Sequence, residues 1–291
     1  MTGDLVNQTV TLRDGRRLGF AEYSDRGGRP VFFFHGAGGS RLEGPADEGA
    51  LENQSIRLIA MDRPGHGLSD PCPDRTLLDW PADVVELADH LGIERFYVLG
   101  WSSGGPYALA CAYRLPERVA AAAIICGVAP PERPHPYRGM PLPSRALLFG
   151  ERNFSPLVTL MRRMSRSMIM GDPQEAGRKA ASFFQPADQA LIKTAEEQAR
   201  LGRDLQEGYR QGWEGPVRDD ILVSRAWGFA LEEITVRIDI WAGEADQMVP
   251  LDHAHYQHAR LPQSRLSVWP QQGHLTLLSC WGEVLAALVG Q

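Results

Sequence analysis

Short, uninterrupted apolar runs that end at glycine, histidine or aspartate constrain the fold of this chain more than any other feature. Residues 31–34 run into His35-Gly36, residues 57–61 into Asp62 and residues 96–99 into Gly100. A strand that is apolar at consecutive positions must be covered on both faces, as in a parallel sheet. Segments with helical periodicity alternate with these runs, at 41–54, 79–91, 103–115, 251–260 and 276–289. The expected fold class is α/β: a mostly parallel twisted sheet with helices on both faces.

Two departures from this alternation organise the chain. Residues 8–12 and 17–23 flank the Asp14-Gly15 turn signal and predict an antiparallel hairpin. Residues 130–232 begin with a series of prolines and continue with helical stretches, of which one is expected over 187–203. We therefore expect a helical lid, or cap, at 130–232, inserted into a core formed by residues 1–129 and 233–291.

A glycine-rich turn carries the candidate nucleophile. Gly100-Trp101-Ser102-Ser103-Gly104 stands between an apolar strand and an alanine-rich helix, and it fits the G-x-S-x-G pattern of a nucleophile elbow. The flanking glycines select Ser102, because Ser103 would have the bulky Trp101 two residues before it. The alternative is a strand-to-helix turn with an incidental serine.

A serine hydroxyl needs a base, and the base needs an orienting acid. Asp246 follows the apolar strand expected at 238–243, and His274 lies on a loop after the next strand, so both fall at the same sheet edge as Ser102. Asp239 and Glu244 are weaker candidates for the acid.

Three further histidines lie on a single expected helix. His253, His255 and His258 are expected on its solvated face, and their spacing misses the i, i+4 relation of a helical metal pair.

Small residues after the first parallel strand allow a backbone to approach a ligand closely. In the segment 35–39, the N–H group of Ala37 can join that of Ser103 in an oxyanion hole. His35 itself is expected to be structural, and the loop at 62–69 is expected to shape the site.

Substrate contacts are expected from the residues beside these groups and from the lid. Met161, Met164 and Met168 form one helical stripe, which either packs the lid on the core or lines the substrate site. The full set of expected substrate-lining residues is Gly36, Trp101, Met161, Met164 and Met168.

Composition limits the classes of function. A formal net charge of −6 argues against a nucleic-acid partner, and no apolar run reaches the roughly 18 residues of a membrane span. The four cysteines are scattered and show no metal-ligand spacing, so we expect neither a metal site nor a disulfide framework. We expect a cytoplasmic protein with a small-molecule substrate and no stable membrane association, and we leave a homodimer open.

Together these residues resemble the α/β-hydrolase superfamily, in its lid-bearing serine esterase, lipase and perhydrolase-like branch. The resemblance covers about residues 8–129 and 233–291 and rests on His35-Gly36, the 62–69 segment, Ser102, Asp246 and His274 in that order. Serine at position 102 separates the chain from relatives with a carboxylate nucleophile, and Ala37 interrupts the H-G-G-G form of the oxyanion loop.

The resemblance implies a cofactor-free serine hydrolase that forms an acyl-enzyme. An ester of a small or medium hydrophobic acyl or aromatic group is the preferred substrate class. A thioester, an amide or a carbon–carbon bond could serve the same triad, and fold similarity cannot choose among them. The alternatives are a lyase, an acyltransferase or a biosynthetic enzyme on the same fold, or a ligand-binding receptor that retains the triad.

Overall fold

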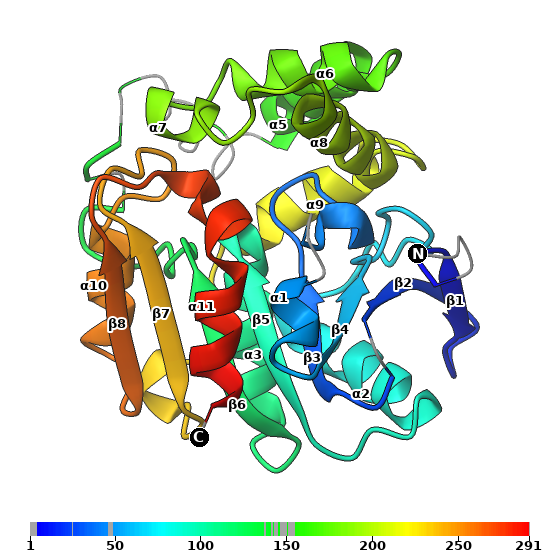
Figure 1. Cartoon of the computed structure of the whole chain (residues 1–291), viewed down its shortest axis with the longest axis vertical. Coiled ribbons are helices and arrows are strands. Elements are labelled where there is room, and N and C mark those ends of the chain that lie inside the picture. Colours follow the sequence, from blue (N-terminus) through cyan, green and yellow to red (C-terminus); the bar gives the residue numbers. More distant parts are fainter. Residues whose placement is uncertain are drawn as a thin grey trace.

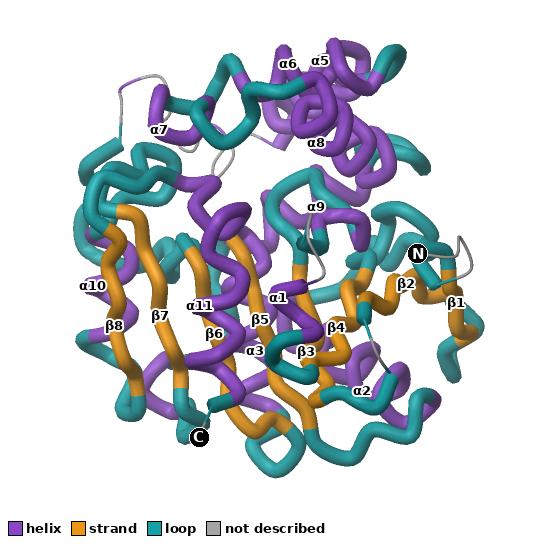
Figure 2. The backbone as a smooth tube through the Cα atoms, in the orientation of Figure 1, coloured by secondary structure: helices purple, strands orange, loops and turns teal. Residues whose placement is uncertain are grey.

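A single eight-stranded sheet forms the centre of the molecule. The computed structural model describes residues 5–290 except residues 25, 46–48, 137, 141, 143–144, 146–149 and 151–154. The strand order is β1-β2-β4-β3-β5-β6-β7-β8 (Figures 1 and 2). The strands are β1 (Gln8–Thr11), β2 (Arg17–Tyr23), β3 (Arg29–Phe34), β4 (Ile56–Met61), β5 (Phe96–Trp101), β6 (Val119–Ile125), β7 (Ile238–Gly243) and β8 (Ser264–Trp269).

The pairing confirms the expected α/β fold class. β1 and β2 form the antiparallel hairpin, β2 pairs antiparallel with β4, and the pairs from β4 through β8 are parallel. β3 shows why these strands have apolar residues at consecutive positions. Phe32 and Phe34 belong to the core on one face of the sheet, and Val31 and Phe33 belong to the core on the other.

Helices cover both faces (Figure 1). α1 (Gly49–Glu52) and α11 (Leu277–Val289) pack on one face, and α2 (Trp80–His90), α3 (Gly105–Arg114) and α10 (Asp252–His258) pack on the other. The helix expected over 41–54 is instead a 3₁₀ turn at Arg41–Glu43 followed by the short α1, with Gly44-Pro45 between them. Proline disfavours helical backbone at the residue before it, which explains the interruption.

The chain between β6 and β7 forms a second helical layer. The helices of this layer whose bounds fall within the described residues include α5 (Ser155–Ile169), α6 (Pro173–Ala181), α7 (Pro186–Gln189), α8 (Ala195–Gly208) and α9 (Glu214–Val223). The single helix expected over 187–203 is divided, because Thr194 starts α8 with a capping box to Glu197. Figure 1 shows α5 to α8 above the carboxyl ends of the strands.

A buried carboxylate fixes the last of these helices to the core. Asp219 of α9 pairs with Arg63 at 2.5 Å, also with Arg75, and accepts a hydrogen bond from Tyr107 at 2.7 Å. Burial opposes ionisation of Asp219, but the two guanidinium groups outweigh it and hold the pKa of this carboxyl well below its usual range. The next residue along α9, Asp220, is thereby held near the carboxyl edge of the sheet.

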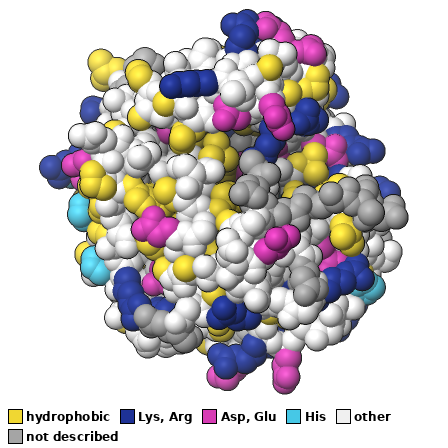
Figure 3. All heavy atoms as spheres, in the orientation of Figure 1, with side chains coloured by type: hydrophobic (Ala, Val, Ile, Leu, Met, Phe, Trp, Pro, Cys, Tyr) yellow, Lys and Arg dark blue, Asp and Glu magenta, His cyan; other side chains and the backbone are white. Residues whose placement is uncertain are grey.

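On the face that Figure 3 shows, acidic and basic side chains are interspersed. The described part of the chain contains no helix that is long and apolar enough to cross a bilayer.

Candidate active site

The turn after β5 holds Ser102 in an unusual backbone conformation. Its φ of 54° is left-handed, which is rare for a residue with a Cβ atom. The neighbouring glycines allow the turn: a Cβ atom at Gly104 would overlap the carbonyl oxygen of Phe34, and one at Gly100 would overlap that of Gly104. The G-x-S-x-G pattern therefore corresponds to a strained turn that only small flanking residues permit.

The structure brings Ser102, His274 and Asp246 together in one hydrogen-bonded row. His274 Nε2 lies 2.9 Å from Ser102 Oγ, and His274 Nδ1 lies 2.8 Å from Asp246 Oδ2. The other carboxylate oxygen, Asp246 Oδ1, accepts the backbone N–H groups of Met248 at 2.8 Å and Val249 at 2.9 Å. Asp246 is thus fixed from both sides, and a base lies within reach of a hydroxyl group.

Electrostatics favour the charged form of the histidine. Burial of the ring lowers the pKa of His274, but the Asp246 carboxylate outweighs this effect and raises the pKa above its ordinary value. The pair can therefore stabilise an imidazolium ion that forms when the hydroxyl gives up its proton.

A carboxylate that the sequence did not indicate supports the histidine loop. Asp188 of α7 is fully buried, and its Oδ1 accepts the backbone N–H of Leu275 at 2.8 Å. A Cβ atom at Gly273 would collide with the same carboxylate. Because Asp188 lies in the helical segment between β6 and β7, no local pattern around His274 could have revealed it.

Trp101 also supports His274 rather than lining the cavity of Ser102. Its indole N–H donates to the carbonyl oxygen of His274 at 3.1 Å, and the two rings stack with centroids 5.9 Å apart. Trp101 lines a separate cavity of about 110 Å³.

Two acidic side chains hold the loop that precedes the turn at Arg41–Glu43. Glu43 accepts the N–H of Gly36 at 2.6 Å, and Asp204 of α8 accepts both the N–H of Ser40 at 3.0 Å and its hydroxyl at 2.7 Å. Both carboxyl groups approach Gly39, where a Cβ atom would lie 2.8 Å from Glu43 and 3.1 Å from Asp204. Burial raises the pKa of Asp204 to about 7 and that of Glu43 well above its usual range.

Buried contacts also position the first part of this loop. Arg63 donates to the carbonyl oxygens of His35 at 2.5 Å and Gly36 at 3.0 Å, while Nε2 of His35 accepts the backbone N–H of Arg63 at 3.3 Å. The structural role expected for His35 agrees with these contacts. Gly36 lies beside the serine, since a Cβ atom there would be 3.8 Å from Ser102 Cβ.

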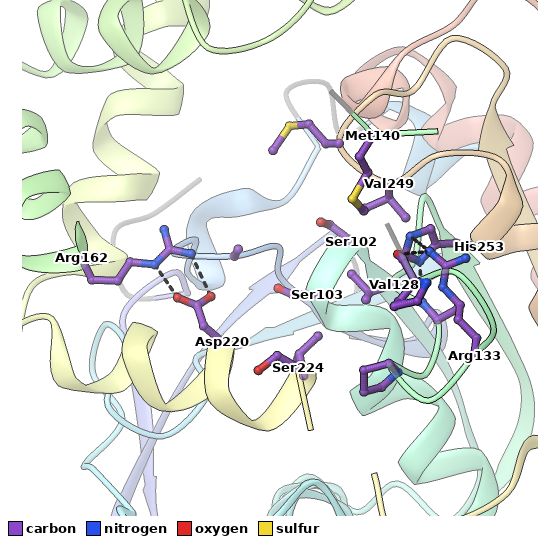
Figure 4. Close-up of a pocket in the computed structure, with 16 residues that line it drawn as sticks. Ser102, Ser103, Val128, Arg133, Met140, Arg162, Asp220, Ser224, Val249 and His253 are labelled. Carbon is purple, nitrogen blue, oxygen red and sulfur yellow. Dashed lines mark hydrogen bonds and ion pairs between the residues drawn. The ribbon is translucent and has the colours of Figure 1, made fainter. Parts of the chain in front are cut away.

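Ser102 opens into a cavity of about 220 Å³ (Figure 4). Ala37 and Ser103, the expected oxyanion-hole residues, line it together with Ser102. Apolar side chains make most of the remaining wall: Val128, Ala129, Pro131, Pro136, Met140, Val223, Met248 and Val249.

The methionine stripe of α5 lies away from this cavity, which corrects its expected substrate-lining role. Met164 is 58% exposed and Met168 is 45% exposed, and neither they nor Met161 line the cavity. Arg162 faces inward instead, because Asp220 offers it a bidentate ion pair at 2.5 and 2.8 Å.

Sequence reasoning also missed two cavity residues, Arg133 and His253. His253 was expected on a solvated helix face, yet it is 4% exposed, as is Arg133. In the structure His253 shares the buried face of α10 with Gln257, four residues later, but a polar glutamine gives no sequence signal of burial. Arg133 lies within a proline-rich stretch, and nothing in its local sequence indicates burial.

Among the described residues, one cluster brings three potential metal ligands together: Cys126, Asp246 and His274, whose ligand atoms lie within 4.8 Å of one another. Asp246 and His274 already bond each other. Burial, with the nearby Asp246 carboxylate, raises the pKa of the Cys126 thiol well above its usual range. His274 already uses both ring nitrogens, Nδ1 toward Asp246 and Nε2 toward Ser102, so neither is left free for a metal ion.

Comparison with known proteins places these features in context. Residues 29–279 match the family model described as alpha/beta hydrolase fold. The chain is 27% identical over 259 residues to a 2-hydroxymuconate semialdehyde hydrolase of Pseudomonas putida, covering 86% of this chain and 82% of the relative. It is 30% identical over 232 residues to a pimeloyl-(acyl-carrier protein) methyl ester esterase of Aromatoleum aromaticum, covering 77% and 82%.

Two further matches differ in extent. A local match, 38% identical over 112 residues, covers 38% of this chain but only 30% of the dihydrolipoyllysine-residue acetyltransferase component of the acetoin cleaving system of Pseudomonas putida. Among solved structures, a hydrolase from Pseudomonas aeruginosa PA01 superimposes with a TM-score of 0.72 at 19% identity, covering 100% of both chains.

Proposed function

Since this chain belongs to the α/β-hydrolase family and is a hydrolase, we propose that it cleaves esters with Ser102 as nucleophile, His274 as base and Asp246 as orienting acid. The single observation that carries the proposal is the hydrogen-bonded row from Ser102 Oγ through His274 to Asp246, at 2.9 and 2.8 Å. The methyl ester esterase among the relatives supports an ester as the bond.

The first half-reaction transfers the acyl group to the enzyme. Ser102 Oγ attacks the carbonyl carbon while its proton passes to His274 Nε2, and the N–H groups of Ala37 and Ser103 stabilise the oxyanion. When the tetrahedral intermediate collapses, the bond to the alcohol oxygen breaks and His274 returns the proton to that oxygen. The alcohol leaves, and the acyl group remains on Ser102.

The second half-reaction regenerates the serine. A water molecule attacks the acyl carbonyl carbon, and its proton passes to His274. Collapse of the second intermediate breaks the bond to Ser102 Oγ, which takes the proton back, and the carboxylic acid is released. No cofactor or metal takes part in this scheme.

The cavity and the helical segment define the substrate class. A small molecule with a small or medium hydrophobic acyl or aromatic group suits a mostly apolar cavity of about 220 Å³. We assign the segment at 130–232 the role of a lid, because Arg162 and Asp220, both from this segment, contribute to the cavity wall. A cytoplasmic location is part of the proposal.

A fluorophosphonate probe tests the nucleophile directly, because it reacts only with an activated serine. Ser102→Ala should abolish both labelling and turnover of p-nitrophenyl butyrate. Ser103→Ala is the matched control, since its hydroxyl is buried without a hydrogen-bond partner among the described residues and its N–H group is retained. If the wild-type protein failed to label, the receptor alternative would replace this proposal; if only Ser103→Ala were inactive, the nucleophile would be reassigned.

A further inference from the structure

One wall of the Ser102 cavity carries a buried polar pair from two distant parts of the chain. Arg133 lies in the loop after β6, and His253 lies in α10. Figure 4 shows them together on one side of Ser102, with the Arg162–Asp220 pair on the other side. Each of Arg133 and His253 is 4% exposed, so neither has bulk water to complete its hydrogen bonding.

This pair holds more hydrogen-bond donors than acceptors. Ala129 donates its backbone N–H to His253 Nδ1 at 3.0 Å, and Arg133 Nη2 lies 2.5 Å from His253 Nε2. Burial, reinforced by the Arg133 charge, lowers the pKa of His253 well below its usual range, so the ring is neutral. A neutral imidazole has one acceptor nitrogen and one N–H. It cannot accept from both neighbours.

The tautomer decides where the surplus donor lies. The backbone N–H of Ala129 can only donate, so Nδ1 accepts and Nε2 carries the hydrogen. That hydrogen faces the Arg133 guanidinium, which has no acceptor nitrogen. An acceptor on a bound molecule could take hydrogen bonds from both groups and so resolve the conflict.

Arg133 also lacks a direct ion-pair partner among the described residues, although the Asp252 carboxylate, which pairs with Arg138 at 3.3 Å, acts on its charge. Arg133 Nη2 donates to the carbonyl oxygen of Pro136 at 2.5 Å, while Nε is buried and has no hydrogen-bond partner within the described part of the chain. No carboxylate among the described residues forms an ion pair with Arg133, whereas Arg162 in the same cavity has the bidentate partner Asp220. A buried guanidinium without a direct ion-pair partner favours binding of an anion.

We propose that Arg133 and His253 bind a carboxylate carried by the substrate, so that the preferred substrate is an ester with a free carboxylate on its acyl chain. Half-esters of short dicarboxylic acids are the simplest members of this class. The carboxylate accepts from the guanidinium and from His253 Nε2–H, while the apolar wall covers the methylene groups between it and the scissile carbonyl. This inference rests on the proposed esterase function and narrows its substrate.

Matched substrate pairs test the preference without any mutation. Monoethyl succinate, glutarate and adipate are each compared with the primary amide of the same half-ester, which keeps the shape and removes the charge. Turnover is followed by titration of the released acid at constant pH. We expect kcat/KM to favour the acid over the amide by at least about tenfold at one chain length. Equal or lower kcat/KM for the acids at all three lengths would overturn the proposal.

A variant of Arg133 tests whether the preference for the acid over the amide comes from Arg133 and His253. In Arg133→Gln the acid-to-amide ratio of kcat/KM should fall to about one. Arg138→Gln is the matched control, because it removes an exposed cation of the same loop that does not line the cavity of Ser102, and its acid-to-amide ratio should stay that of the wild type. If Arg133 serves only to anchor its loop, Arg133→Gln will lower Tm and leave the ratio unchanged, which refutes a binding role.

A binding measurement separates failure of this inference from failure of the esterase proposal. Calorimetric titration of the Ser102→Ala protein with the three half-esters reports carboxylate binding without turnover. Binding of a half-ester but not of its amide supports the subsite even if the wild-type protein shows no esterase activity. If Ser102→Ala binds the half-ester and its amide equally, or binds neither, the subsite is refuted. If the wild-type protein still labels with fluorophosphonate in that case, the esterase proposal stands.

Discussion

Replacement of Asp246 by asparagine gives a quantitative test of the proposed triad. Asp246 Oδ1 accepts two backbone N–H groups, from Met248 and Val249, at 2.8 and 2.9 Å. In Asp246→Asn the side-chain oxygen must keep that position, because an amide nitrogen there would face two donors. The NH₂ group is then directed at His274 Nδ1 and donates to it.

This rearrangement puts the proton of His274 on the wrong nitrogen. With Nδ1 accepting, Nε2 carries the hydrogen and faces Ser102 Oγ, so the hydroxyl proton has no acceptor. The wrong tautomer in serine proteases reduces kcat about 10⁴-fold, which corresponds to roughly 5.4 kcal/mol of transition-state stabilisation. We expect a loss of that order in kcat for p-nitrophenyl butyrate.

The assay combines steady-state turnover with the rate of fluorophosphonate labelling, and both should fall together, because both need the activated hydroxyl. Matched controls come from the two other acidic candidates, Asp239 near the start of β7 and Glu244 directly after its end. Asp239→Asn and Glu244→Gln should each retain turnover within about tenfold. Near-normal turnover in Asp246→Asn, or a 10⁴-fold loss in either control, would refute the assignment of the acid.

Three further predictions concern pH and the lid. The kcat/KM of the wild-type protein should rise with pH, because only neutral His274 accepts a proton. Asp246 raises the pKa of His274, so the midpoint of this rise should lie above the usual histidine value of about 6.5. A midpoint below about 6 in the pH profile would contradict this prediction. Burial raises the pKa of Asp204 to about 7, against about 3.9 in the unfolded chain. Between these pH values the folded state binds one more proton than the unfolded state, so the free energy of unfolding should decrease as pH rises from about 4 to 7. Urea unfolding of Asp204→Asn should show a weaker dependence of this free energy on pH, and the same dependence as in the wild type would refute the assignment. Met164 is 58% exposed, so Met164→Lys should change stability by less than about 0.5 kcal/mol and leave the acyl-length profile unaltered; a shifted profile on a series of p-nitrophenyl esters would restore its substrate-lining role.

Local sequence determined the central sheet and the elements that carry the proposed triad. The apolar run at 31–34 predicts a strand buried on both faces, because successive side chains of a strand point to opposite faces of the sheet. The glycines around Ser102 report a turn that larger residues could not form. Asp246 and His274 follow strands whose carboxyl ends meet at one edge, so their approach to Ser102 follows from the order of the chain. These signals are contained within a few residues, which is why they could be read from sequence.

Tertiary structure alone decided which side chains surround the serine. The face of α5 that turns toward the cavity depends on Asp220, 58 residues beyond Arg162. The bidentate ion pair places Arg162 toward the cavity, and the methionine stripe lies away from it. The donor excess at Arg133 and His253 likewise arises between residues 120 positions apart. Such contacts are selected by burial and by the partners that remain available after the chain has packed. Hydrophobic periodicity predicts which apolar residues become buried. A charged group is buried favourably only where a partner lies within reach, and the position of that partner is known only from the folded chain.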